Sequence, residues 1–260
     1  MKGDDPRASD VTSDVTGDVA AEARAPADPA AEHPLVTVDV VILTMRKRRL
    51  EALLIKRKRW PYEGLRAIPG GFVGPDESLE DAARRVLEHQ AVARDVYLEQ
   101  LYTFGDPHRD PRARVITVVY YALIRADALH VALASPSAPN GSGGANRPGD
   151  DATESAWFPV DALPPMAFDH ADILHYTMQR LRGKLEYTDI GYQLLAPEFT
   201  LSELQEVYEA ILSPRTLDKR NFRKKVLSTG ILEPTTHTRK SGQHRPAALY
   251  RFSPRAERGA

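Results

Sequence analysis

The sequence of 260 residues predicts an α+β protein with two folded domains, the second of them a winged helix-turn-helix domain. Residues 35 to 124 combine strand patterns rich in β-branched side chains with one amphipathic helix pattern. Residues 197 to 230 contain two short helix patterns, and residues 231 to 252 have the pattern of a β-hairpin. Residues 1 to 33 have almost no large apolar side chains, so we expect a disordered acidic extension there.

Four strand patterns build the first folded domain. LVTVDVVILTM at residues 35 to 45 is dense in β-branched residues and predicts a buried strand, and EALLIKR predicts a second strand that ends near Arg57. Further strands are predicted at residues 97 to 104 and 114 to 124. The turn formers in SPSAPNGSGGANRPGDD predict a flexible loop at about residues 134 to 153.

One helix is predicted inside this domain and a second at its end. Asp76 or Ser78 can cap the first helix, which we expect to run to about Ala93. Its apolar face is formed by Leu79, Ala82, Ala83, Val86 and Leu87. The second helix is expected to start near Asp169, to run to Leu181 or beyond and to bridge the two domains.

The predicted elements divide the chain into five parts. These are the acidic extension 1–33, the first domain 34–165, a linker helix 166–185, the winged helix domain 186–252 and a basic tail 253–260. Three short helices and a terminal hairpin are expected in the winged helix domain.

The composition limits the compartment and the kinds of metal site. The chain has no cysteine, which excludes disulfides and thiolate metal sites and fits a reducing cytoplasm. The first residues lack a signal-peptide core, and the longest apolar run, residues 38 to 45, is far too short to span a membrane. We therefore expect a cytoplasmic protein without a membrane partner.

Charge is distributed unevenly along the chain, although the formal net charge is only −1. Residues 1 to 33 hold eight acidic side chains against three basic ones, whereas residues 213 to 260 hold twelve Lys or Arg against three acidic ones, a balance of +9. A basic segment of this size attracts polyanions, and nucleic acid is the first candidate.

The basic segment contains the pattern of a helix-turn-helix. PEFTLSELQEVYEAIL at residues 197 to 212 predicts an amphipathic helix capped by Thr200 or Ser202, and TLDKRNFRKKVLSTG predicts a second helix that ends at Gly230. The core side of the second helix is expected to hold Leu217, Phe222, Val226 and Leu227. The opposite side presents Lys219, Arg220, Asn221, Arg223 and Lys224. Such a helix can enter a major groove, where Arg reads guanine and Asn reads adenine.

The hairpin pattern beyond this helix predicts a basic wing. Its tip would carry Arg239, Lys240, His244 and Arg245, while Arg215 and Lys225 suit phosphate contacts. Double-stranded DNA is favoured over RNA because the segment lacks a run of exposed aromatic residues for base stacking. A solvated surface charge is the competing interpretation for each basic residue taken alone.

The motif G-x5-E-x7-R at Gly71, Glu77 and Arg85 resembles the front of a Nudix box. In that pattern the arginine is followed by a helical turn with three glutamates. This sequence has Val86, His89 and Gln90 at the glutamate positions and Val92 in place of the glycine that follows.

The three replaced glutamates remove the expected metal ligands. Cleavage of a pyrophosphate needs Mg²⁺ ions held by several oxygen ligands, and valine, histidine and a neutral glutamine do not supply them. We therefore predict no bound metal and no catalytic residue. Substitute carboxylates remain as an alternative metal site, with Glu80, Asp81 and Glu88 as candidates.

With both halves in view, the chain resembles the NrtR family of Nudix-related transcriptional regulators of NAD metabolism. The resemblance covers about residues 34 to 252 and is carried by LLIKRKRWPYEGLRAIPGGFV, WFPVDALPPMAFDH and TLDKRNFRKKVL. It implies a Nudix-like α/β/α sandwich before the winged helix, and a homodimer that holds a palindromic operator. It also implies an effector, ADP-ribose or another NAD-derived metabolite, with no cofactor required. Related regulators sense sugars, so the effector stays less certain than the architecture.

The resemblance also implies which residues bind the effector. Carried over from the strand end, loop and box that face the diphosphate in the family, these are Arg57, Arg59, Arg66, Gly71, Phe72, Glu77 and Arg85. Phe104 and Asp106 are further candidates on the nucleoside side, with His108 near them. Glu77 and Arg85 can instead serve only to brace the loop.

Three functions from different classes follow from these patterns. The first is a ligand-responsive repressor with an inactive Nudix-like sensor. The second is an ADP-ribose pyrophosphatase with an atypical metal site and a basic tail. The third is a pseudoenzyme scaffold that binds another protein.

Overall fold

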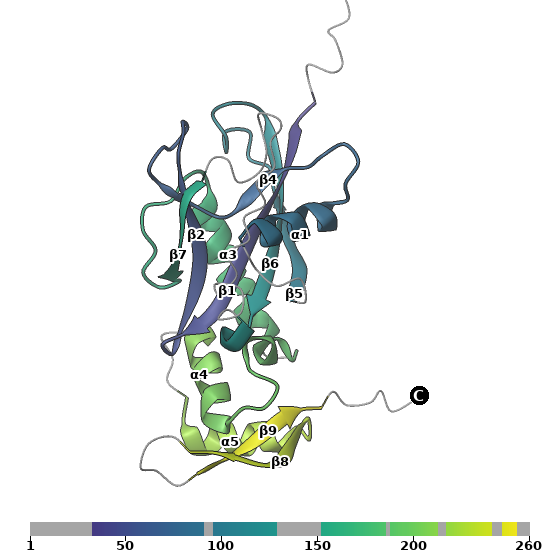
Figure 1. The fold of residues 1–260 in the computed structure, drawn as a ribbon, viewed down its shortest axis with the longest axis vertical. Helices are drawn as coiled ribbons and strands as arrows, with labels where there is room; N and C mark the ends of the chain where they lie inside the picture. The colour runs from purple at the N-terminus through teal and green to yellow at the C-terminus, as the bar shows by residue number, and fades with distance from the viewer. Residues whose placement is uncertain are drawn as a thin grey trace, which may run out of the picture. The chain divides into compact units, whose positions relative to one another are not determined.

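The computed structural model describes residues 33–90, 96–128, 152–185, 188–212, 217–240 and 246–253 (Figure 1). Its first half contains β1 (Leu35–Arg46), β2 (Arg49–Arg57), β3 (Arg66–Ala67), β4 (Gly70–Phe72), α1 (Leu79–His89), β5 (Tyr97–Phe104), β6 (Val115–Ile124) and β7 (Ala152–Pro159). Its second half contains α3 (His170–Lys184), the 3-10 helix η2 (Ile190–Leu194), α4 (Leu201–Leu212), α5 (Lys219–Ser228), β8 (Leu232–Arg239) and β9 (Ala247–Phe252). Among these described helices, none has the length and apolar character needed to cross a bilayer.

The first seven strands form one mixed sheet in the order β3-β2-β1-β6-β5, with β4 paired to β1 and β7 to β2. β1 and β6 run parallel, and the other pairs are antiparallel. One edge of β1 pairs with β4 at residues 37 to 39 and with β2 at residues 43 to 46. The two neighbours of β1 therefore part in the middle of the strand, and this parting opens the sheet for the cavity described below.

Side chains of β1 alternate between two hydrophobic cores, because successive residues of a strand point to opposite faces of a sheet. Val38, Val40 and Ile42 pack with α1, whereas Val41 and Leu43 pack with α3 and the C-terminal helices. The sheet is thus covered by helices on both faces, which is the α/β/α sandwich that the resemblance implied.

Helix α1 begins as predicted and ends earlier than predicted. Ser78 is the N-cap, and its hydroxyl accepts a hydrogen bond from the backbone N–H of Asp81 at 3.1 Å. The helix ends at His89, short of the expected Ala93, because the N–H of Gln90 turns back to the carbonyl of Leu87 at 3.0 Å. Residues 91 to 95 lie outside the described part of the chain.

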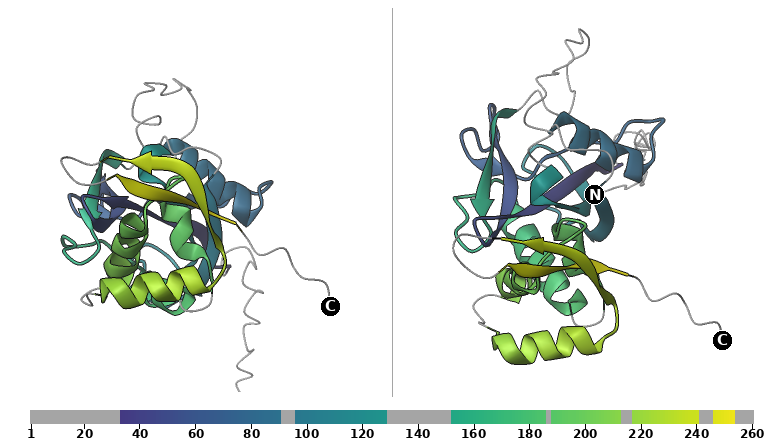
Figure 2. Two further views of the ribbon diagram at one scale, coloured as in Figure 1. Left: turned by 90° about the horizontal axis from the view of Figure 1, so that it is seen from below. Right: turned by 60° about the horizontal axis from the view of Figure 1, so that its bottom comes forward.

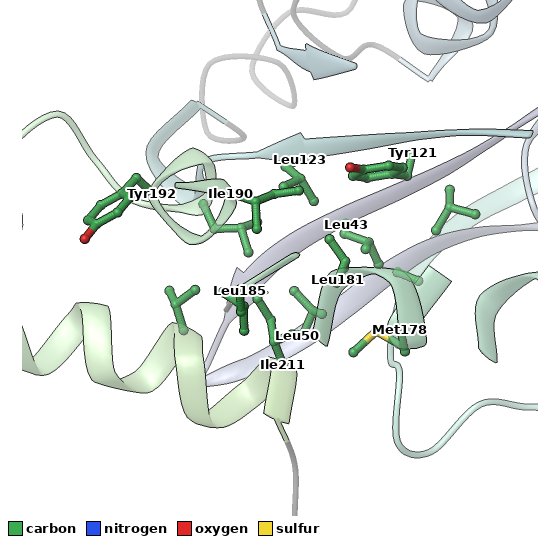
Figure 3. Close-up of a cluster of buried hydrophobic side chains, with 14 of the residues drawn as sticks. Leu43, Leu50, Tyr121, Leu123, Met178, Leu181, Leu185, Ile190, Tyr192 and Ile211 are labelled. Carbon is green, nitrogen blue, oxygen red and sulfur yellow. The ribbon is translucent and has the colours of Figure 1, made fainter. Parts of the chain in front are cut away.

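Helix α3 starts where the sequence predicted, with Asp169 as its N-cap residue, and runs to Lys184. It lies on the sheet, where one core joins the sheet to α3, η2 and α4 (Figure 3). Side chains of that core in Figure 3 are Leu43, Leu50, Tyr121, Leu123, Met178, Leu181, Leu185, Ile190, Tyr192 and Ile211. Buried apolar contacts therefore run without interruption from the sheet into the winged helix.

The C-terminal elements form a winged helix. Thr200 and Glu203 cap α4 reciprocally: the N–H of Thr200 donates to Glu203 Oε2 at 2.7 Å, and the N–H of Glu203 donates to Thr200 Oγ1 at 3.1 Å. Two backbone hydrogen bonds, of 2.9 and 2.8 Å, join Phe199 before α4 to Tyr250 in β9. Figure 1 shows α5 and the β8–β9 hairpin below α4, and Figure 2 shows the same elements from below and with this side turned forward.

One apolar residue of α5 was assigned to the wrong side. Phe222 and Val226 are buried as predicted, but Leu227 is 46% exposed. Leu227 follows Val226 by one position, which turns it about 100° away from the buried stripe on a helix of 3.6 residues per turn. Gly230 follows the helix with a φ of +69°, a left-handed conformation that glycine adopts without strain.

Candidate effector cavity and DNA-binding surface

A cavity lies between β2 and β4, at the point along β1 where its pairing changes from β4 to β2. The start of α3 lies next to this cavity. Its lining comes from segments far apart in the sequence: Thr37, Asp39, Ile55, Arg57, Arg59, Ala67, Ile68, Gly70, Gly71, Phe72, Arg109, Asp110, Arg112, Val115, Phe168 and His170. The strand β1, the loop before α1, the segment before β6 and the start of α3 therefore build one site.

Asp39 lines the cavity and is only 7% exposed. The hydroxyl of Thr117 donates a hydrogen bond to Asp39 Oδ2 at 2.7 Å. Gly70 lies against the same carboxylate, because a Cβ built on Gly70 would be 1.9 Å from Asp39 Oδ1 and 2.8 Å from the carbonyl oxygen of Val38. The backbone at Gly70 can lie this close to the carboxylate of Asp39 only because glycine has no side chain.

His170, the first residue of α3, is buried in the wall of the cavity. Its Nδ1 accepts the backbone N–H of Ile68 at 2.8 Å, so the ring proton lies on Nε2, which faces Asp39 Oδ2 at 3.9 Å. Burial lowers the pKa of His170 below its usual range, against the opposing effect of Asp39. The ring is therefore neutral near pH 7. Its hydrogen bond fixes the backbone at Ile68, which leads into β4.

Arg109 ties the cavity to the N-terminus of α3. Its guanidinium makes two hydrogen bonds to the N-cap Asp169, Nε to Oδ2 at 2.9 Å and Nη2 to Oδ1 at 2.7 Å. The same Nη2 lies 3.7 Å from Asp39 Oδ2. Paired bonds of this kind fix a guanidinium in orientation as well as in position.

A second pair of arginines packs on the ring of Phe168. The guanidinium carbons of Arg57 and Arg112 lie 4.8 and 5.7 Å from the centroid of the ring. Arg57 Nε also donates to the carbonyl of Pro61 at 2.7 Å, and Arg112 makes two hydrogen bonds to Asp110. Burial raises the pKa of Asp110, but the bonds from Arg112 outweigh it and the net shift is downward, so this carboxyl stays ionised.

The cavity carries an excess of positive charge. Four arginines and two aspartates line it, and the histidine is neutral, which leaves a formal balance of +2. Arginines in fixed orientations match the oxygen geometry of phosphates. The apolar rings of Phe72 and Phe168 stand beside them. The arrangement suits a ligand that combines a diphosphate with less polar groups.

Four of the predicted effector residues line this cavity: Arg57, Arg59, Gly71 and Phe72. Arg66 lies elsewhere, since its guanidinium bonds to Glu154 and stacks over Phe158 at 5.0 Å. The strand pairing explains this position: Arg66 belongs to the short strand β3, which pairs with β2, and β2 also pairs with β7, the strand that carries Glu154 and Phe158.

Glu77 and Arg85 brace the loop before α1, which was the alternative role predicted for this pair from the sequence. Arg85 binds both carboxylate oxygens of Glu77 and donates to the carbonyl of Phe72 at 3.0 Å, while Glu77 Oε1 accepts the N–H of Gly74 at 2.7 Å. Hydrogen bonding from Arg85 lowers the pKa of Glu77. Neither side chain lines the cavity, but their pairing holds Phe72, which does.

The nucleoside-side candidates lie away from the cavity lining. Phe104 packs edge-on with Tyr102 at 5.5 Å and with Tyr176 at 5.7 Å between ring centroids. Asp106 accepts the backbone N–H of His108 at 2.7 Å, which closes the loop locally. These three residues do not touch the cavity as described.

Sequence reasoning missed seven polar or aromatic residues of the lining: Thr37, Asp39, Arg109, Asp110, Arg112, Phe168 and His170. Two signals were present. A lone carboxylate interrupts the apolar strand VTVDVVIL, and the segment AFDH contributes Phe168, the cap Asp169 and His170. A charged residue inside a buried strand needs a partner, which marks Asp39 as a candidate.

The replaced glutamate positions of the box carry no Mg²⁺ ligand set. Val86 is 3% exposed and packs in the core between α1 and the sheet. Gln90 accepts a hydrogen bond from the hydroxyl of Ser155 at 2.7 Å, and His89 is exposed. Within the described ranges, no three His, Asp or Glu side chains gather as they would around a metal ion.

Helix α5 presents a basic surface, as predicted. Its N-cap Asp218 accepts the N–H of Asn221 at 2.7 Å. The predicted contact residues Lys219, Arg220, Asn221, Lys224 and Lys225 are exposed. Arg223 is half-buried and donates to the hydroxyl of Ser202 on α4 at 3.3 Å, so part of this side chain packs between the helices instead of facing outward.

One basic residue of the wing is held by contacts to the neighbouring helix, which the sequence did not predict. Arg239 pairs with Glu203 and donates to the carbonyl of Glu198 at 3.1 Å, which ties the wing to the start of α4. Lys240 is exposed. The predicted residues Arg215, His244 and Arg245 lie outside the described part of the chain.

Comparison with protein-family models gives two matches. The model of the NUDIX domain matches residues 33–177, and the model of the NrtR DNA-binding winged helix domain matches residues 191–252. Together the two matches include both the cavity and the basic helix.

Comparison with individual proteins gives relatives of two kinds. The ADPR responsive transcriptional repressor NtrR of Acinetobacter baylyi is 36% identical over 224 residues, 85% of this chain and 82% of that protein. The crystal structure of Shewanella oneidensis NrtR complexed with a 27mer DNA has a TM-score of 0.69 and 34% identity, covering 84% of this chain and 94% of that one. The ADP-ribose pyrophosphatase of Methanocaldococcus jannaschii is 34% identical over 151 residues, 58% of this chain and 77% of that protein.

Proposed function

Because the chain belongs to the NrtR family of Nudix-related transcriptional regulators, we propose that it represses genes of NAD metabolism under the control of ADP-ribose. The Nudix domain binds ADP-ribose in the cationic cavity, and the winged helix binds a DNA operator. The observation that carries the proposal is the presence, in one folded unit, of a cavity of charge +2 and an exposed basic helix.

The diphosphate of ADP-ribose is the group that the cavity recognises in this proposal. Arg57 and Arg112 are held on Phe168, and Arg109 is held by Asp169, so their guanidinium groups are oriented before a ligand arrives. Groups fixed in advance lose little entropy on binding, which favours affinity. Support from the relatives comes from the Acinetobacter repressor, which is named for its response to ADPR.

The proposal predicts that ADP-ribose weakens DNA binding. A duplex is first selected from random-sequence DNA with the wild-type protein, and its affinity is then measured by fluorescence anisotropy with and without ADP-ribose. We expect a loss of affinity of about 5- to 150-fold, the usual range of allosteric coupling. The selected sequences should have two-fold symmetry, because we also propose that the protein binds as a homodimer. An affinity that ADP-ribose leaves unchanged would contradict the proposed control.

We further propose that the Nudix domain does not hydrolyse its ligand. The side chains at the three replaced glutamate positions support this: a buried valine, an exposed histidine and a glutamine bonded to Ser155. Hydrolysis is the second candidate function, because a relative at 34% identity is an ADP-ribose pyrophosphatase.

An end-point assay separates the two candidates. The full chain is incubated with ADP-ribose and either Mg²⁺ or Mn²⁺, and AMP and ribose 5-phosphate are measured by chromatography. We expect no product above the level of a boiled sample. Product formed at a rate typical of enzymes, above about 1 per second, would establish the hydrolase instead.

A further inference from the structure

Helix α3 has one end at the cavity and the other end at the winged helix. At its start, His170 lines the cavity and the N-cap Asp169 binds Arg109 through two hydrogen bonds. In its last turn, Arg182 Nε donates to the carbonyl oxygen of Ile211 at 2.9 Å. One helix therefore touches both the proposed ligand site and α4.

The contact at Ile211 lies at a sensitive place in α4. The carbonyls of the last turn of a helix have no partner within the helix, so a side chain that binds one of them fixes the position of that end. Helix α4 ends at Leu212, and the basic helix α5 begins at Lys219. Glu209 on α4 accepts the N–H of Leu217 before α5 at 3.0 Å, and Tyr208 on α4 packs edge-on against Phe222 on α5 at 5.2 Å between ring centroids. A displacement of the end of α4 can thus reach the proposed DNA-binding helix through these contacts.

Helix α3 can move only as a rigid body, because one side of it is buried along its whole length. Ile173, Leu174, Met178 and Leu181 are at most 6% exposed and pack in the core shared by the sheet and α4. Met178 and Leu181 are labelled in Figure 3. Its 15 residues span about 22 Å at 1.5 Å per residue. Packed helices shift between discrete arrangements instead of deforming continuously, so a shift at one end appears at the other.

A second link between the sheet and α4 is weaker. Arg48, in the turn between β1 and β2, pairs with Glu206 at 3.2 Å, but the side chain of Arg48 is 73% exposed. Ion pairs this exposed are screened by solvent and contribute little. The half-buried hydrogen bond of Arg182 is the stronger candidate for coupling.

We propose that α3 transmits ligand binding from the cavity to the winged helix, and that Arg182 is the residue that couples α3 to α4. This inference rests on the proposed function, since it explains how ADP-ribose at the cavity alters DNA affinity. Ligand phosphates that draw Arg109 toward them pull on Asp169 and shift α3. The hydrogen bond from Arg182 then carries the shift to the end of α4.

The test compares Arg182 with a neighbour on the same helix. R182M keeps the apolar stem and removes the donors, and R182Q has a side chain too short to reach the carbonyl of Ile211. R180M is the matched control, because Arg180 is exposed and makes no hydrogen bond or ion pair with the described residues. For each protein, affinity for the selected duplex is measured with and without ADP-ribose, and ADP-ribose affinity and the melting temperature are measured separately.

We expect R182M and R182Q to bind ADP-ribose like the wild type while the ratio of the two duplex affinities falls by about fivefold or more, toward one. R180M should keep the wild-type ratio. A wild-type ratio in either folded Arg182 variant overturns the role of Arg182. A wild-type protein whose duplex affinity ignores ADP-ribose contradicts the proposed function itself, so the two failures are distinguishable.

Discussion

The substitution Gly70→Ala is expected to destabilise the protein by about 3 kcal/mol and to abolish ADP-ribose binding at ligand concentrations that saturate the wild type. A methyl group at this position would lie 1.9 Å from Asp39 Oδ1 and 2.8 Å from the carbonyl of Val38. The carboxylate cannot simply swing away, because Thr117 holds Asp39 Oδ2. The segment Gly70–Phe72 must therefore move, and because these residues line the cavity, its wall changes shape.

A glycine elsewhere in the chain provides the control. Gly183 lies near the end of α3, where an added Cβ meets nothing within 4 Å. Gly183→Ala should raise stability by about 0.5–1 kcal/mol, because alanine restricts the unfolded chain and favours the helix. Urea unfolding gives both free energies, and calorimetric titration gives ADP-ribose affinity. Equal stability of the two variants would show that the loop around Gly70 is looser than its contacts indicate.

Most of the elements follow from the sequence, because they depend on local patterns. The β-branched strands, the cap at Ser78, the start of α3 near Asp169 and the Glu77–Arg85 pair were all predictable from residues close together in the chain. Each is decided by hydrogen bonds or apolar spacing within a few residues. The resemblance then supplied the sandwich, which strand patterns alone leave undetermined.

The cavity could be predicted only in part, because its polar base joins distant segments. Asp39, Arg109 and His170 come from three parts of the chain, and their proximity depends on the pairing of β1 with β4 and β6. Arg66 illustrates another difference: the family motif predicts it near the ligand, whereas its guanidinium bonds to Glu154 outside the cavity lining. A family motif predicts which segments lie near the ligand. The pairing of strands in the sheet determines the direction of each side chain.

Helix α5 shows that sequence patterns also fail to predict the contacts of a single residue. Periodicity places both Arg220 and Arg223 on the outer side of α5, but the hydroxyl of Ser202 on α4 draws Arg223 inward. Contacts between helices are set by packing, which a helical period does not contain. The two arginines therefore have different expected roles, and this difference can be measured.

Arg220→Ala is expected to weaken binding of the selected duplex by about 10- to 100-fold, the usual effect of losing one paired contact to a base. Because Arg220 is exposed, its loss should leave the melting temperature and ADP-ribose affinity unchanged. Arg223→Ala should lower both the melting temperature and duplex affinity, since it removes a contact between α4 and α5. Anisotropy with selected and unselected duplexes separates base reading from phosphate binding. If Arg220→Ala weakens both duplexes equally, Arg220 contacts phosphate, and a different residue of α5 reads the operator.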